Sequence, residues 1–215
     1  MRYSIKFCLV FFYFSACISD GTKTKVQKPL IISEVEGCTF SCDVNKTEVI
    51  WSGFKTTDKI KVTGQFKTFK SKKLHTQKNF LSVQDLVEGL DFVIAAGSLS
   101  SNDPIRDLNL KEHFFKFFVN HLTIKGSFGK IENDSIVVEI ELIEQKKSFK
   151  LGFSYDHDVV EIKGTVNLLK QLNAQKAFDS IERKCKDLHK GEDGVSKTWE
   201  EVEIHIKAPI IKNCN

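Results

Sequence analysis

Residues suited to acid–base, metal or nucleophilic chemistry are scattered along this chain of 215 residues. The six histidines stand at positions 75, 113, 121, 157, 189 and 205, and no H-x-H or H-E-x-x-H motif joins them. The segment Gly152-Phe-Ser-Tyr-Asp lacks the final glycine of a nucleophile elbow and lies in a predicted strand, whereas that motif needs a strand–helix turn. No glycine-rich phosphate loop precedes a helix. We therefore expect no enzymatic activity, no metal site and no cofactor.

Cysteines are the other reactive group, and they stand at six positions: Cys8, Cys17, Cys38, Cys42, Cys185 and Cys214. In an oxidising compartment the last four could form up to two disulfides, with three possible pairings that the sequence cannot separate. The Cys38-Thr-Phe-Ser-Cys42 spacing could instead be half of a zinc site. Because that spacing is loose and no histidine pair lies near it, we prefer disulfides.

One stretch, SNDPIRDLNLKEHFFKFF at 101–118, combines a turn, an Arg-Asp pair and four phenylalanines. Asp103-Pro104 predicts a turn, and Asp107 can cap a helix from Leu108 to about Phe118. Arg106 could bind a ligand headgroup or phosphate, or it could pair with a carboxylate and fix the loop. On a helical wheel one side is apolar, and Asn109 lies opposite; the apolar side comprises Leu108, Leu110, Phe114, Phe115, Phe117 and Phe118.

The elements that must position these residues are mostly strands. Apolar residues alternate with polar ones from 60 onward, and short polar turns such as Glu132-Asn-Asp134 and Asp156-His-Asp158 separate the runs. Such spacing predicts antiparallel hairpins. We expect an all-β fold, an antiparallel sheet of about eight strands that curls into a closed or nearly closed barrel, with a few flanking helices. A one-sided apolar stripe over 173–188 predicts one of these helices, and Ser82 caps a shorter one.

The N-terminus has the pattern of an export signal. Arg2 and Lys6 precede an apolar run over 7–14 that is too short to span a bilayer. Small residues before Cys17 resemble a bacterial lipobox, in which Cys17 would be acylated, although Phe14 replaces the usual leucine. The alternative is ordinary secretory cleavage near Ser19. Both predict export to the periplasm or cell envelope, and acylation would add a membrane anchor.

These patterns divide the chain into a signal at 1–19, a linker and N-terminal extension at 20–43, and a barrel domain at 44–210. The formal charge of +4 falls to +2 once Arg2 and Lys6 are removed. That bias is too small to indicate nucleic-acid binding, and no basic stripe with interleaved aromatic residues is present.

Several segments resemble the YceI-like family of lipid- and polyisoprenoid-binding proteins. Val49-Ile-Trp-Ser-Gly-Phe-Lys55, followed by Val62-Thr-Gly-Gln-Phe66, is similar to the first hairpin of that family. Ser98 to Asn102, Arg106-Asp107 and Leu110 to Phe115 resemble its polar turn, Arg-Asp pair and paired phenylalanines, and Leu122 to Gly126 resembles its next strand. The resemblance covers about 48–206. Asn109 departs from it, since many relatives have histidine there, and 186–199 looks like an extension of a subgroup.

The resemblance implies an extended lipocalin-like barrel whose apolar interior holds an isoprenoid chain, such as a quinone or a polyprenyl group. The expected partner is thus a lipid ligand, with Arg106 as a possible headgroup contact. The helix at 108–118 would form a wall or lid, held by the turn at Pro104 and the Arg106-Asp107 pair. The expected contacts of the chain are Trp51, Phe66, Phe92, Ile94, Phe114, Phe115, Phe118, Phe128, Ile140, Phe153 and Ile162.

Two other functions remain open at this point. An envelope adhesin or structural lipoprotein would use the barrel as a scaffold, with Phe66, Phe128 and Phe153 filling its centre. A small-molecule hydrolase would need a nucleophile–base pair that the sequence does not present. We therefore expect a non-enzymatic exported carrier or sensor; its oligomeric state is not predicted.

Overall fold

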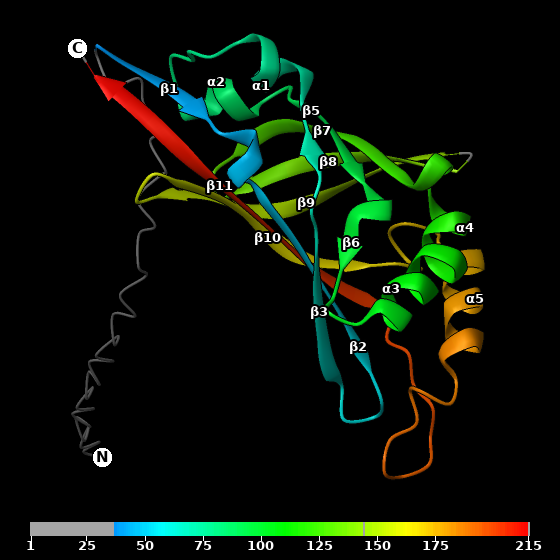
Figure 1. The fold of residues 1–215 in the computed structure, drawn as a ribbon. Coiled ribbons are helices and arrows are strands. Elements are labelled where there is room, and N and C mark those ends of the chain that lie inside the picture. Colours follow the sequence, from blue (N-terminus) through cyan, green and yellow to red (C-terminus); the bar gives the residue numbers. More distant parts are fainter. Residues whose placement is uncertain (1–36, 144, 215) are drawn as a thin grey trace, which may run out of the picture.

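The computed structural model describes residues 37–143 and 145–214, in which eleven strands form one sheet (Figure 1). Every strand pairing is antiparallel, so the predicted fold class is confirmed. The strands are β1 (Cys38–Cys42), β2 (Glu48–Lys55), β3 (Ile60–Phe66), β4 (Phe69–Lys70), β5 (Asp91–Ala95), β6 (Leu99–Ser100), β7 (Thr123–Glu132), β8 (Ser135–Leu142), β9 (Gln145–Asp156), β10 (Val159–Asn167) and β11 (Glu201–Cys214).

The strand count exceeds the predicted eight, partly because two strands are interrupted. Residues 67–68 separate β3 from β4, and the 3-10 turn η2 (Ala96–Ser98) separates β5 from β6. Along the chain β4 continues β3, and β6 continues β5. The two interrupted strands are neighbours in the sheet, because β4 pairs with β5 and β3 pairs with β6. Ser98 bridges the break: its carbonyl accepts from Lys67 N at 3.3 Å and its Oγ from Thr68 N at 3.1 Å. The ends of the sheet order β4-β5-β7-β8-β9-β10-β11-β2-β3-β6 therefore meet.

The third additional strand is β1, which lies within the range assigned to the linker and extension. It pairs with β11 over Cys38–Cys42, and a disulfide joins Cys38 to Cys214. The sequence allowed up to two disulfides and left their pairing open. The structure contains one among the described residues, Cys38–Cys214, and Cys42 and Cys185 are free thiols. Part of 20–43 thus belongs to the sheet. The predicted signal at 1–19 and the acylation of Cys17 lie outside the described residues.

Short helices flank the sheet in two groups. The helices α1 (Lys72–Thr76) and α2 (Val83–Val87) lie near one end, and α2 begins at the predicted cap, Ser82, whose Oγ accepts from Asp85 N at 2.9 Å (Figure 1). At the other end α3 (Pro104–Leu110), the π-helical η3 (Lys111–Phe115) and α4 (Lys116–Phe118) pack beside α5 (Gln175–Cys185). The remaining 3-10 turns are η1 (Val44–Lys46) and η4 (Asn120–Leu122). No helix in the described ranges is long and apolar enough to cross a membrane.

The helix at 104–118 starts earlier than predicted. Asp103, not Asp107, is the N-cap, because its Oδ1 accepts from the backbone N–H groups of Ile105 (3.1 Å) and Arg106 (3.0 Å). Pro104 is the first helical residue, where its missing N–H costs no hydrogen bond. The sequence suggested a turn at this proline, and the proline instead opens the helix.

The predicted apolar side of this helix is only partly correct. Phe114, Phe115 and Phe118 are buried, but Phe117 is 47% exposed and Leu108 is 59% exposed. A π-helical turn holds one more residue than an α-turn, so it changes which later side chains face the sheet. Asn109, expected on the polar side, is buried.

The hydrophobic core lies on the concave side of the curled sheet. The inward residues of the predicted alternation, such as Ile136, Phe153 and Ile162, are almost fully buried. The turns between β7 and β8 and between β9 and β10 contain positive φ angles at Asn133 and at His157 and Asp158, as tight hairpins require. The period-two pattern therefore predicted both the core face and these hairpins.

Candidate functional site

The curled sheet and the helices α3 to α5 enclose a cavity of about 430 Å³. Its walls are mostly apolar side chains from β2, β3, β5, β7 to β11, η3, α4 and α5. The volume lies within the range of about 300–1,000 Å³ that is typical of sites for one small molecule. Two of its lining residues, Ile105 of α3 and Leu188 in the loop after α5, are 70% and 59% exposed, so the cavity wall reaches the molecular surface at these residues.

Most of the residues predicted to contact a ligand line this cavity. They are Trp51, Phe66, Phe92, Ile94, Phe114, Phe115, Phe118 and Ile140. Phe128, Phe153 and Ile162 do not line it; they are buried in the packed part of the core, and Phe128 lies against Phe92 with ring centroids 4.8 Å apart. Period-two alternation identifies an inward side chain but not the depth at which it lies, so it could not separate cavity wall from packed core.

Two strand glycines make room for aromatic rings of the wall. A Cβ atom on Gly64 would lie 2.3 Å from Cζ2 of Trp51, and one on Gly126 would lie 2.5 Å from Cζ of Phe92. Both rings can therefore occupy their places only because these positions have no side chain, and a Cβ on Gly126 would also lie 2.3 Å from the backbone oxygen of Glu139. Gly53 differs, since a Cβ there would meet no atom within 4 Å although the residue lines the cavity.

The buried phenylalanines of η3 and α4, which are Phe114, Phe115 and Phe118, form one aromatic cluster. Phe114 lies 5.1 Å from Phe115 and 4.9 Å from Phe118, and Phe115 lies 5.7 Å from Phe66 of β3, measured between ring centroids. Edge-to-face and tilted contacts of this kind are favoured by the quadrupoles of the rings. The cluster joins the helical wall of the cavity to the sheet.

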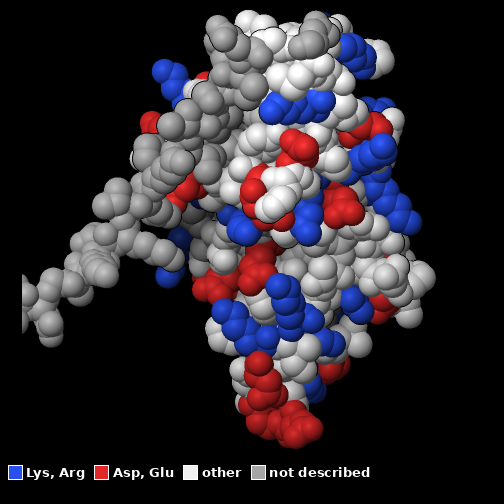
Figure 2. Space-filling model, turned by 90° about the vertical axis from the view of Figure 1, so that its left-hand side faces the viewer, with Lys and Arg blue, Asp and Glu red and all other residues white. Residues whose placement is uncertain are grey.

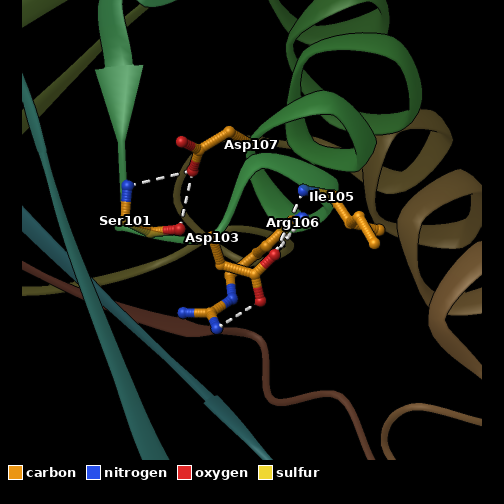
Figure 3. A network of polar contacts seen from close by, with 5 residues as sticks. All are labelled: Ser101, Asp103, Ile105, Arg106 and Asp107. Carbon is orange, nitrogen blue, oxygen red and sulfur yellow. Dashed lines mark hydrogen bonds and ion pairs between the residues drawn. The ribbon is translucent and has the colours of Figure 1, made fainter.

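Arg106 lines the cavity but already has a carboxylate partner. Its Nη2 donates to Oδ2 of Asp103 at 2.8 Å (Figure 3). The backbone N–H of Arg106, followed by its guanidinium, lowers the pKa of Asp103. The second of the two interpretations of Arg106, a pair that fixes the turn, therefore matches the structure.

Arg106 and Asp107, the neighbours in the sequence motif, do not bind each other. Asp107 instead accepts from both the N–H (2.9 Å) and the Oγ (2.6 Å) of Ser101, which fastens the start of α3 to the loop after β6 (Figure 3). Adjacent residues on a helix point in different directions, so the two members of this sequence motif have separate partners.

Sequence reasoning missed the polar end of the cavity. Lys55 at the end of β2, together with His189 and Thr198 from the loop after α5, lines the cavity there. Thr198 forms an isolated antiparallel bridge with Lys55, and its Oγ1 lies 2.8 Å from Nδ1 of His189. The inward register of β2 could have identified Lys55, because Val49, Trp51 and Gly53 precede it at every second position.

The loop at 186–200 brings these residues together by pairing with the β2–β3 hairpin. Thr56 N donates to Lys197 O at 2.9 Å, and Trp199 Nε1 donates to Thr56 O at 2.8 Å. The loop lies below α5 in Figure 1 and contributes Leu188, His189, Thr198 and Trp199 to the cavity lining. This is the segment that looked like a subgroup extension in the sequence.

Cys185 is the thiol that lines the cavity near this polar end. Burial raises the pKa of its thiol, so the reactive thiolate is disfavoured. Within residues 37–143 and 145–214, no three His, Cys, Asp or Glu side chains lie together as metal ligands. The chemistry available in the cavity is thus apolar contact, one ion pair and a small set of polar groups at one end.

The opposite side of the molecule has a mixed charge. Figure 2 looks from the side away from α3 and α5 and shows basic and acidic side chains interspersed. Elsewhere in the described residues, ion pairs such as Lys61–Glu203 and Lys150–Glu132 join charged side chains of different strands. Exposed pairs of this kind contribute little to stability, because water and salt screen them.

Comparison with known proteins shows the fold. No protein-family model matches the sequence, and no curated protein matches it. A polyisoprenoid-binding domain from Saccharophagus degradans, implicated in plant cell wall breakdown, has a TM-score of 0.52 at 9% identity over 82% of this chain and 98% of that chain. This chain therefore shares the fold of that domain, and the fold implied by the resemblance to the YceI-like family is confirmed.

Two further solved structures are similar over most of their length. BcnA of Burkholderia cenocepacia has a TM-score of 0.46 at 12% identity, covering 80% of this chain and 99% of BcnA. The YceI protein of Campylobacter jejuni has a TM-score of 0.40 at 14% identity, covering 72% of this chain and 85% of that chain.

Proposed function

We propose that this chain is an exported, non-enzymatic binding protein that holds an isoprenoid-type lipid, a quinone or a polyprenyl chain, in its apolar cavity. The observation that carries the proposal is the cavity of about 430 Å³ between the sheet and the helices α3 to α5. A scaffold has no need of such a space, whereas a lipid carrier does. The shared fold with a polyisoprenoid-binding domain supports the same class of ligand.

Burial of an apolar tail supplies the driving force for this function. Each methylene-sized unit removed from water contributes about 0.8 kcal/mol before the costs of association are subtracted. The cavity of about 430 Å³ has the size of a site for one small molecule, so it can bury one apolar tail. A longer tail would reach the molecular surface beside Ile105 and Leu188.

The test uses the two tryptophans of the chain, Trp51 and Trp199, which both line the cavity. Titration with farnesol or decylubiquinone should change their fluorescence saturably at one ligand per chain. Mass spectrometry of a solvent extract from gently purified protein should show a stoichiometric lipid. Absence of both the fluorescence change and an extracted lipid would overturn the proposal.

Gly53 provides a matched pair of variants. Gly53→Leu should place a side chain in the cavity, because nothing lies within 4 Å of a Cβ at this position, and should weaken farnesol binding at least tenfold. Gly53→Ala should bind within twofold of the wild type, since one methyl group fills little of the space. Equal affinity of the Leu and Ala variants would place the ligand elsewhere.

A further inference from the structure

Lys55 is a cation on the cavity-facing register of β2. Val49, Trp51 and Gly53 precede it on the same face of the strand. All four of these residues line the cavity. The side chain of Lys55 makes no hydrogen bond or ion pair with the residues that the structure describes, although it is half-buried. This ammonium therefore lacks an anionic partner, and it would attract an anion that enters the cavity.

The other charges of the cavity cannot supply that partner. Asp103 is the one carboxylate among the described lining residues, and its Oδ2 accepts from Arg106 at 2.8 Å. These two charges cancel, so Lys55 leaves the cavity with a net positive charge at its polar end. An anion would complete this arrangement.

Hydrogen-bonding groups lie beside this unpaired charge. Thr198 bridges to Lys55 through the backbone, and the imidazole of His189 is 2.8 Å from the Thr198 hydroxyl. Burial, followed by the charge of Lys55, lowers the pKa of His189, so the imidazole is neutral at pH 7. The polar end therefore offers one fixed cation with neutral hydrogen-bonding groups around it.

We infer that Lys55 binds the anionic headgroup, a carboxylate or a phosphate, of a single-chain lipid whose tail occupies the cavity. This inference rests on the proposed function and narrows it, because a quinone ring carries no such charge. It also moves the headgroup contact from Arg106, the residue indicated by the sequence, to Lys55. A volume of about 430 Å³ falls in the range of sites that hold one small molecule, which favours a lipid with a single tail.

The experiment compares ligands that differ only in the headgroup. Farnesyl phosphate and farnesol share one tail, as do myristic acid and myristyl alcohol, and the fluorescence of Trp51 and Trp199 reports the binding of each. We expect at least one anionic member to bind the wild type tenfold or more tightly than its alcohol. Preference in the prenyl pair alone would indicate a phosphate, and preference in the fatty pair alone a carboxylate.

Three variants test whether Lys55 is responsible. Lys55→Met should weaken binding of the preferred acid or phosphate at least tenfold and so remove the preference for the anionic headgroup, whereas Lys55→Arg should keep most of that preference. Lys61→Met is the control, because Lys61 lies on the same hairpin but is exposed and pairs with Glu203. Circular dichroism verifies that each variant is folded.

The outcomes separate this inference from the proposed function. If the anionic ligands and their alcohols bind the wild type equally, or if Lys55→Met keeps the preference, the assignment of the headgroup site to Lys55 is wrong. The proposal that the cavity binds an apolar lipid is then unaffected. If none of the four ligands binds, both proposals fail.

Discussion

The pKa of His189 is lowered by its surroundings in the cavity wall. Its ring is half-buried in the wall of the cavity, close enough to Lys55 for that charge to act on it. Desolvation first, and the lysine second, lower the pKa of the imidazole. Protonation of His189 is therefore less favourable in the folded protein than in the unfolded chain, where histidine titrates near pH 6.5.

This shift predicts a loss of stability in mild acid. A lowered pKa of histidine means that the unfolded chain binds more protons, so the contribution is full above about pH 6.5 and is lost as the pH falls through the folded pKa. Thermal unfolding at pH 7.5 and pH 5.0 should show a smaller pH-dependent decrease in Tm for His189→Gln than for the wild type. His75→Gln, at an exposed position on α1, should behave as the wild type does. An unchanged decrease in His189→Gln would contradict this account.

At the scale of elements, the π-helical turn η3 decides which phenylalanines build the cavity wall. An uninterrupted α-helix from Leu108 would place Phe117 on the apolar side with Phe114 and Phe118, as the helical wheel predicted. With η3 present, Phe118 is 7% exposed and Phe117 is 47% exposed. Extra-residue turns of this kind occur frequently at functional sites, which agrees with the position of η3 beside the cavity.

Two neighbouring substitutions test this register. Phe118→Ala should reduce the free energy of unfolding by about 3 kcal/mol or more, because it removes a buried ring and its contacts with Phe114 and Phe115. Phe117→Ala should change it by about 0.5 kcal/mol or less, since the ring is largely in water. Urea unfolding curves measure both values. Equal losses would mean that the helix keeps a regular α-helical register.

At the scale of the whole molecule, the disulfide between Cys38 and Cys214 joins the two ends of the described chain. The two cysteines are 176 residues apart in sequence and are register partners in the pairing of β1 with β11. Cross-linking such distant residues restricts the unfolded chain, and the loop-entropy model assigns roughly 5 kcal/mol to a loop of this length. The bond also holds β1 on the sheet.

Removing the disulfide should therefore lower global stability. The double variant Cys38→Ser/Cys214→Ser should lose about 2–5 kcal/mol in the free energy of unfolding, and dithiothreitol should destabilise the wild type by a similar amount. Cys42→Ser is the control, because Cys42 is a free thiol in the same strand. A double variant as stable as the wild type, with no response to the reductant, would contradict this prediction.

The sequence predicted the overall architecture because alternation along strands is a local property. Hairpins, core face and the α5 stripe are all encoded within about ten neighbouring residues. The strand breaks at Lys67 and Ser98 were not predictable from local sequence. The hydrogen bonds that hold them join residues about thirty positions apart in the chain. At the polar end of the cavity, the register of β2 could have identified Lys55, whereas Thr198 could not be placed beside it, because its loop lies more than a hundred residues downstream.

The position of the Cys38–Cys214 bond has a practical consequence for handling the protein. In Figure 1 the C-terminal end of β11 lies at the upper left, whereas the loop at 186–200, which contributes to the cavity lining, lies at the bottom. A biotin tag or a sensor-chip linkage added at the C-terminus would thus hold the molecule by its far end. Surface-immobilised protein should bind lipids presented in solution as freely as untethered protein.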